Sequence, residues 1–212
     1  GISKDVFERS IAYGTAVGLA VIEHTKTDNY KETRTFPKFT VDENDPKRWQ
    51  PTPPDYKDAA EPHWSKIRPF VLDSAGQFLP PPPPPFDTSK GSAFRKMVEE
   101  VYSSLEVNNR AEREEIAYFW DDNPFVSHHA GHVMFADKKV TPGGHWMNIA
   151  MLASRMEKAD FVKSSETYLY TAVGLLEGFI SCWHAKYFYN LVRPETYINK
   201  YMDQDWRPFL QT

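Results

Sequence analysis

Apolar residues recur at helical spacing in several separate stretches of the chain and predict a framework of helices. The first stretch runs from Val6 to about Thr25, although Gly14 and Gly18 weaken its pattern. The longest stretch runs from about Phe161 to Val192 and is apolar nearly all round. A helix of that composition is typical of a buried position, so we expect it to be central to the fold.

Three shorter helices are predicted between these two. One begins after Ser92, a residue type that caps helices well, and extends to about Leu105. A second spans about Asn109 to Trp120, with acidic residues in its first turns, where they favour the helix dipole. A third begins at Pro142 or Gly143 and continues to Met156. No segment is a convincing strand, and the expected fold class is all-α, a helix bundle.

Two proline-rich stretches interrupt the helical pattern. Residues 27–64 are predicted to form an ordered, irregular arm, because their large aromatic side chains would otherwise be stranded in water. Long loops of this kind are often binding walls. Pro80–Pro85 is a run of six prolines, which is stiff and extended, and a spacer across the surface is favoured over a docking site for a proline-reading domain. We expect one helical domain over residues 1–212.

Composition narrows the function classes. The net charge is −4 and no basic patch stands out, which argues against nucleic-acid binding, whereas a small-molecule substrate with one anionic group is compatible. Aromatic residues make up 15% of the 212 residues, and they require burial against this chain or against a partner. No run of about 18 apolar residues occurs, so no membrane-spanning helix is predicted.

Lys186 and Arg193 are the most informative charged residues, since they lie at the end of the longest predicted helix with six residues between them. Seven positions at about 100° each come within roughly 20° of two full turns, which places both cations on one face, about 10 Å apart along the axis. A lysine ammonium and an arginine fork that converge in this way can hold a tetrahedral oxyanion.

A solvated helix face is the ordinary meaning of a Lys–Arg pair at this spacing. Here aromatic and aliphatic residues lie between the two charges and favour burial, and a buried cation needs a partner. An anionic ligand is one such partner, and Glu166 or Glu177 on the same helix is another. Trp183 and Asn190 are candidate pocket-lining residues near the pair, with helix packing and a simple polar contact as their alternatives. Cys182, the single cysteine, is expected to be a buried, unreactive thiol.

Four of the seven histidines lie within residues 125–145: His128, His129, His132 and His145. His129 and His132 have the three-residue spacing of helical metal ligands, but the Ala-Gly between them and the preceding Pro124 favour a loop, so no direct metal site is predicted. Histidines usually line pocket walls or bond to backbone groups. His128, His129 and His145 are therefore candidate pocket-lining residues.

The stretch from Lys186 to Pro194, KYFYNLVRP, resembles the first signature segment of a known superfamily. It joins type 2 phosphatidic acid phosphatases, bacterial acid phosphatases and vanadium-dependent haloperoxidases. The resemblance implies a helical-bundle core, and it implies that Lys186 and Arg193 bind phosphate or the vanadate that takes its place. Further segments resemble the amino-terminal half of secreted bacterial members of the haloperoxidase type: Trp49-Gln50-Pro51-Thr52-Pro53-Pro54, Pro62-His63-Trp64, Phe119-Trp120-Asp121 and Pro142-Gly143-Gly144-His145-Trp146.

Two further signature segments of that superfamily do not occur in this sequence. One is Pro-Ser-Gly-His, whose histidine is a general acid. The other is Arg-x5-His-x3-Asp, whose histidine is the nucleophile or the vanadium ligand. By the resemblance, this chain carries no catalytic residue and is expected to be inactive alone. A second polypeptide, or a continuation of the chain, is predicted to carry the remaining motifs.

The resemblance implies oxidation of a halide by hydrogen peroxide, with vanadate as the candidate cofactor. An acid phosphatase that hydrolyses phosphomonoesters is the near alternative, because one site geometry serves both reactions. A secreted helical binding protein, which grips sugar or peptide with exposed aromatic side chains, is the alternative from a different class. The branch without membrane spans is the closer match, so a secreted, periplasmic or cell-envelope location in a bacterium is expected.

Overall fold

The computed structural model describes residues 1–104, 108–130 and 133–210, and in them the chain is mainly helical. The predicted all-α class is therefore confirmed. Two short strands, β1 (Phe125–Ala130) and β2 (Val133–Lys138), and a 3-10 helix, η1 (Trp64–Lys66), accompany the α-helices. These helices are α1 (Lys4–Thr25), α2 (Tyr30–Thr33), α3 (Ala93–Ser103), α4 (Arg110–Trp120), α5 (Pro142–Met156), α6 (Phe161–Tyr189) and α7 (Pro194–Tyr201).

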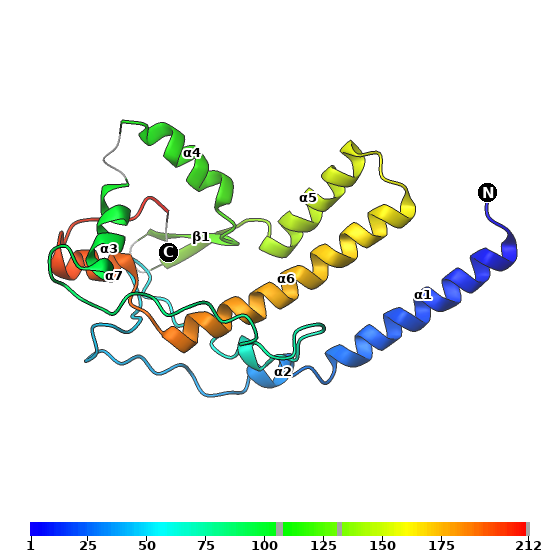
Figure 1. Cartoon of the computed structure of the whole chain (residues 1–212), viewed down its shortest axis with the longest axis horizontal. Coiled ribbons are helices and arrows are strands. Elements are labelled where there is room, and N and C mark those ends of the chain that lie inside the picture. The colour runs from blue at the N-terminus through cyan, green and yellow to red at the C-terminus, as the bar shows by residue number, and fades with distance from the viewer. Residues whose placement is uncertain (105–107, 131–132, 211–212) are drawn as a thin grey trace.

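The longest helix, α6, is the central element of the fold (Figure 1). Asp160 caps its start by accepting a hydrogen bond from the Lys163 N–H at 2.8 Å. α5 begins at Pro142, as predicted, and packs along α6 in the opposite direction, while η1 packs against another part of α6. Among the described residues, no helix is both long and apolar enough to cross a membrane.

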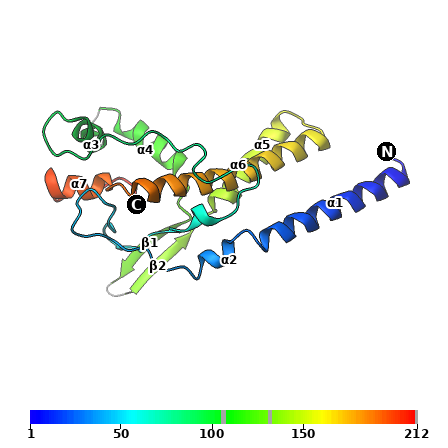
Figure 2. The same cartoon turned by 60° about the horizontal axis from the view of Figure 1, so that its bottom comes forward.

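The amino-terminal helix α1 projects away from the other elements (Figures 1 and 2). It begins two residues before the predicted Val6, and Gly14 and Gly18 do not interrupt it. None of its residues is buried, although it carries many apolar side chains. Its contact with the rest of the fold is near its end, where the His24 ring stacks on Phe70 with 4.1 Å between centroids.

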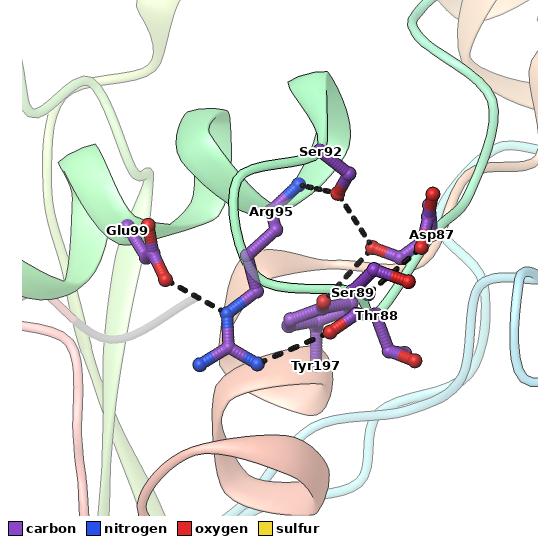
Figure 3. Close-up of polar contacts among 7 residues, drawn as sticks. All are labelled: Asp87, Thr88, Ser89, Ser92, Arg95, Glu99 and Tyr197. Atoms are coloured by element: carbon purple, nitrogen blue, oxygen red, sulfur yellow. Dashed lines mark hydrogen bonds and ion pairs between the residues drawn. The ribbon is translucent and has the colours of Figure 1, made fainter.

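The main hydrophobic core lies between α3 and α7, where Phe94, Val98, Val192, Tyr197 and Ile198 are buried together. A polar network fixes the entry to α3 against this core (Figure 3). In it, the Ser92 hydroxyl accepts from the Arg95 N–H at 3.1 Å, which confirms Ser92 as the cap. The Arg95 Nε donates to Glu99 at 2.8 Å, and the hydroxyl of Tyr197 donates to the Asp87 carbonyl at 3.1 Å.

A second, smaller core joins α6 to the segment that follows the arm. Ile67, Ala75 and Ile180 are buried together there. Glu177 of α6 is also buried, and its carboxylate accepts hydrogen bonds from the backbone N–H groups of Phe70 at 2.6 Å and Leu72 at 2.9 Å. A buried carboxylate that is satisfied in this way stabilises the fold rather than serving as a free charge.

Several elements differ from the sequence prediction. β1 and β2 form an antiparallel hairpin, with Phe125 opposite Lys138 and Ala130 opposite Val133, where no strand was expected. Each strand is stabilised by hydrogen bonds to the other strand. The residue pattern of one strand taken alone does not reveal this pairing. α7 was not predicted. α6 ends three residues before the predicted Val192.

Candidate functional site

Lys186 lies in the last turn of α6, on a face that is tied to the arm. Its Nζ lies 5.1 Å from the ring centroid of Trp183 and 5.7 Å from that of Tyr187. Such cation–π contacts favour a charged lysine over these rings. The indole N–H of Trp183 and the hydroxyl of Tyr187 both donate to the Ala60 carbonyl, at 2.9 and 2.5 Å, and so join α6 to the arm.

Arg193 lies beyond the end of α6, so the prediction that it shares one helix face with Lys186 is wrong. Asn190 adopts the left-handed conformation, with φ 46° and ψ 46°, and turns the chain. Leu191 then pairs with Arg48 of the arm in an antiparallel bridge. Arg193 has extended dihedrals and is the N-cap of α7, because Pro194 disfavours a helical conformation before it.

Lys186 and Arg193 nevertheless line the same pocket, which has a volume of about 230 Å³. The arm supplies the other walls: Trp49, Thr52, Lys57, Asp58 and Ala60. The Nη1 of Arg193 donates to the Thr52 hydroxyl at 2.8 Å. The other two charged groups of the pocket have partners of their own. Lys57 pairs with Asp55 at 3.0 Å, and Asp58 pairs with Lys38 at 2.9 Å.

Lys186 and Arg193 differ from Lys57 and Asp58 in their ion pairing. In the part of the chain that the structure describes, no salt bridge joins Lys186 or Arg193 to a carboxylate. The two glutamates considered as partners are occupied elsewhere. Glu166 pairs with Lys163 at 2.9 Å, and Glu177 accepts from the backbone after η1.

Burial lowers the pKa of both cations, which shows that their charged forms are incompletely compensated. The positive charge of Arg193 lowers the pKa of Lys186 further. For Arg193, the negative charge of Glu195 partly offsets the effect of burial. Burial also raises the pKa of Tyr187 to about 12, so its hydroxyl stays neutral and cannot serve as the missing anion at ordinary pH. An anionic ligand in the pocket would offset the cost of burying the two charges.

A second, larger pocket of about 610 Å³ adjoins the first, since Trp49, Lys186 and Arg193 line both. Its remaining walls are mostly apolar and come from the polyproline segment and the end of α6: Pro80, Pro81, Pro83, Cys182, Ala185, Leu191 and Val192 are among them. Tyr189 fixes the polyproline segment here, because its hydroxyl donates to the Pro80 carbonyl. A charged pocket and an apolar pocket therefore share one edge.

The other candidate residues near the pair have distinct positions. Trp183 packs between Trp64, 4.9 Å away, and Phe179, 5.3 Å away, and it does not line either pocket. Asn190 lines the larger pocket. Cys182 also lines that pocket and is exposed, so the prediction of a buried thiol is wrong. Its side of α6 is left uncovered in the described part of the chain.

Among the predicted histidines, His145 is not brought to the pair. It is in the first turn of α5, where its Nδ1 contacts Asp122, and it does not line either pocket. The backbone of His128 and His129 belongs to β1, so the helical spacing considered for His129 and His132 does not apply. His132 lies outside the described residues. Within the described residues, no group of three or more potential metal ligands occurs.

Sequence reasoning did not single out the arm residues that complete the pocket, although it predicted that the arm would be a binding wall. Thr52 and Trp49 lie in the motif Trp-Gln-Pro-Thr-Pro-Pro, which was noted only for its resemblance. A threonine held between prolines in an aromatic segment was the available signal, because such a residue has few conformations and a hydroxyl to offer.

Comparison with known proteins agrees with this fold. No protein-family model matches the chain, and no curated protein matches it. A solved structure does match, and the class of protein it represents is the vanadium-dependent haloperoxidase type. It is described as the crystal structure of the first bacterial vanadium-dependent iodoperoxidase. The match has 50% sequence identity and a TM-score of 0.83, and it covers 97% of this chain.

The resemblance predicted from the sequence is therefore confirmed. Over nearly all of its length the chain resembles part of a bacterial haloperoxidase-type protein. The match covers 48% of the iodoperoxidase chain, so this chain spans about half the length of the protein that it resembles.

Proposed function

We propose that this chain is the oxyanion-binding part of a haloperoxidase-type enzyme that oxidises halide with hydrogen peroxide. The observation that carries the proposal is the pair of half-buried cations, Lys186 and Arg193, which line one pocket without a carboxylate salt bridge among the described residues. The match to an iodoperoxidase supports the choice of reaction type.

The residues of the pocket fit vanadate. Two incompletely compensated positive charges suit an anion with several oxygens, and the arginine adds a fork of N–H donors. Bound vanadate would supply the Lewis-acidic centre at which peroxide is activated toward halide. Lys186 would neutralise negative charge at the oxygens, and Arg193 would orient them. Because the protein holds these groups in place in advance, they need not reorganise as charge shifts during the reaction.

Phosphate is the alternative occupant, since the same charges suit either tetrahedral anion. An acid phosphatase is thus the second candidate function. In both cases we propose that a second polypeptide or a continuation of the chain supplies the catalytic histidine segments, which this sequence does not contain. A secreted or periplasmic location is also part of this proposal, and cell fractionation would test it.

The first prediction concerns anion binding. Wild-type chain should bind orthovanadate and phosphate, and Lys186→Ala and Arg193→Ala should each weaken binding by about 10- to 100-fold, because each removes charge-assisted hydrogen bonds of about 1.5–3 kcal/mol. Isothermal titration calorimetry and vanadium-51 NMR measure the effect. Lys163→Ala is the matched control, since this exposed lysine of the same helix pairs with Glu166. It should leave binding unchanged.

Two results would separate the alternatives. Tight vanadate binding with weak phosphate binding favours the haloperoxidase, and the reverse favours the phosphatase. If neither anion binds, or if both pocket variants bind like wild type, the oxyanion proposal is wrong. Binding of sugar or peptide that is lost on Tyr170→Ala, an exposed aromatic of α6, would then favour the non-enzymatic binding protein.

A further inference from the structure

Arginine has a long side chain with many rotamers, and Arg193 lies just before the start of a helix. It is an N-cap residue between a left-handed turn and α7, and it makes no side-chain cap bond to that helix. A free arginine side chain carries about 2 kcal/mol of rotamer entropy, which an anion would have to overcome on binding unless the protein has already fixed the guanidinium. The structural question is therefore what holds Arg193 in place.

Thr52 provides a polar anchor. Its hydroxyl accepts from the Arg193 Nη1 at 2.8 Å, and the residue is only 4% exposed. Its own backbone is restrained as well, because it lies between Pro51 and Pro53 and its carbonyl accepts from the Tyr56 N–H at 3.0 Å. Within the described residues, this is the one hydrogen bond that the guanidinium makes. The remaining N–H groups are left for a ligand.

Trp49 provides an apolar support. Its ring centroid lies 5.8 Å from the Arg193 Cζ, within the range of a cation–π contact, and the residue is 8% exposed. The backbone around it is joined to the turn before Arg193. The Trp49 N–H donates to the Asn190 carbonyl at 3.1 Å, and the Val192 N–H donates to the Lys47 carbonyl at 2.8 Å. The arm therefore holds both the base and the tip of Arg193.

We propose that Thr52 and Trp49 are positioning residues that fix the Arg193 guanidinium for anion binding. The inference rests on the proposed function only for what the guanidinium binds. The positioning itself is a property of the ligand-free chain and can be measured without any anion. Thr52 acts through its hydroxyl and Trp49 through its ring, so the two contributions can be tested one at a time.

The first measurement uses NMR of the guanidinium N–H groups in the ligand-free chain, with the Arg193 signals assigned by their loss in Arg193→Lys. Wild type should show slowed rotation of the Arg193 Nη groups. Thr52→Val, which keeps the shape and removes the hydroxyl, should abolish this restraint, and Thr52→Ser should restore it. Trp49→Leu should broaden or shift the same signals while the Thr52 contact is retained.

The second measurement titrates the same variants with phosphate and orthovanadate. Thr52→Val should weaken binding roughly 10-fold, and Thr52→Ser should stay within about threefold of wild type. In an Arg193→Ala background, Thr52→Val should have no further effect, because its role is to act through Arg193. A general structural role would instead weaken binding in both backgrounds, and that outcome would overturn the inference.

The two measurements test the proposed function and the positioning of Arg193 separately. If wild type binds neither anion while Thr52→Val still frees the Arg193 signals, the proposed function fails and the positioning stands. If the Arg193 signals are the same in wild type, Thr52→Val and Trp49→Leu, the positioning is wrong whatever the chain binds. Thermal unfolding of each variant shows that it is folded, and Thr52→Ala, which also removes the hydroxyl, replaces Thr52→Val if that variant does not fold.

Discussion

At the scale of single residues, the candidate site depends on two positive charges, Lys186 and Arg193, that the chain compensates only in part. Lys186 shows the effect most simply, because burial and the neighbouring Arg193 both lower its pKa. A base whose pKa falls on folding is destabilised in its protonated form. The protonated form costs stability at low pH, and this cost disappears as pH rises through the lowered pKa. An anion that binds the protonated form reverses the shift and raises the pKa again.

A pH prediction follows for Lys186. Sulfate keeps the same charge over the neutral and alkaline range, so it isolates the titration of the protein. Sulfate binding should persist while Lys186 is protonated and should fall as pH rises through its pKa, which lies below the ordinary 10.5. In Lys186→Arg the alkaline loss should move to higher pH, because arginine stays protonated. Calorimetric titrations at a series of pH values test this, and an unchanged alkaline limb in Lys186→Arg would contradict it.

At the scale of elements, the position at which α6 ends determines whether Lys186 and Arg193 can line the same pocket. If α6 continued through Val192, Arg193 would follow the helical course that its spacing suggested. Instead the left-handed Asn190 ends the helix, and the backbone from Asn190 to Val192 pairs with the arm. The Lys–Arg spacing pointed to two residues that line one pocket, but the shared helix face that it predicted does not occur.

The conformation of Asn190 gives a stability prediction. Asn190→Gly should leave the free energy of unfolding within about 0.5 kcal/mol, because glycine adopts the left-handed region freely. Asn190→Val should lower it by about 1–2 kcal/mol, because a β-branched residue is strained there. Urea unfolding followed by circular dichroism compares the two. Equal stability of both variants would show that the turn does not depend on this conformation.

How much the sequence could predict also differs between elements. α1, α3, α4 and α5 were predicted within a few residues, since local periodicity and residues such as Ser92 and Pro142 carry the signal. The hairpin β1–β2 depends on the pairing of two neighbouring strands, whereas the end of α6 and the pairing of Arg48 with Leu191 depend on contacts between distant parts of the chain. Lys186 and Arg193 were identified as candidates from their chemistry. Thr52 was not, because only the folded arm brings it to Arg193.

At the scale of the whole molecule, the exposed apolar surface is large for a chain of this length. α1 buries none of its residues, and Phe7, Ile11, Leu19 and Ile22 are all exposed. The chain also spans about half the length of the iodoperoxidase that it resembles. These two facts agree with the proposal that further polypeptide covers this surface and completes the site.

The corresponding prediction concerns activity and protection together. With vanadate, peroxide and iodide, this chain alone should show no peroxidase activity. Addition of a polypeptide equivalent to the uncovered part of the iodoperoxidase should restore activity and slow amide exchange in α1, as measured by hydrogen–deuterium exchange. The same addition to Arg193→Ala should slow exchange without restoring activity. Activity of the chain alone would contradict the proposal.

The bond between Arg193 and Thr52 spans 141 residues, and this has a consequence during protein synthesis. At about 5–20 residues per second, roughly 7 to 28 seconds separate the appearance of Thr52 from that of its partner. Through that interval the arm, with its tryptophans and phenylalanines, has been made but has no α6 to pack against. The nascent arm therefore exposes these aromatic side chains to proteases and to neighbouring chains on the ribosome until α6 has been made.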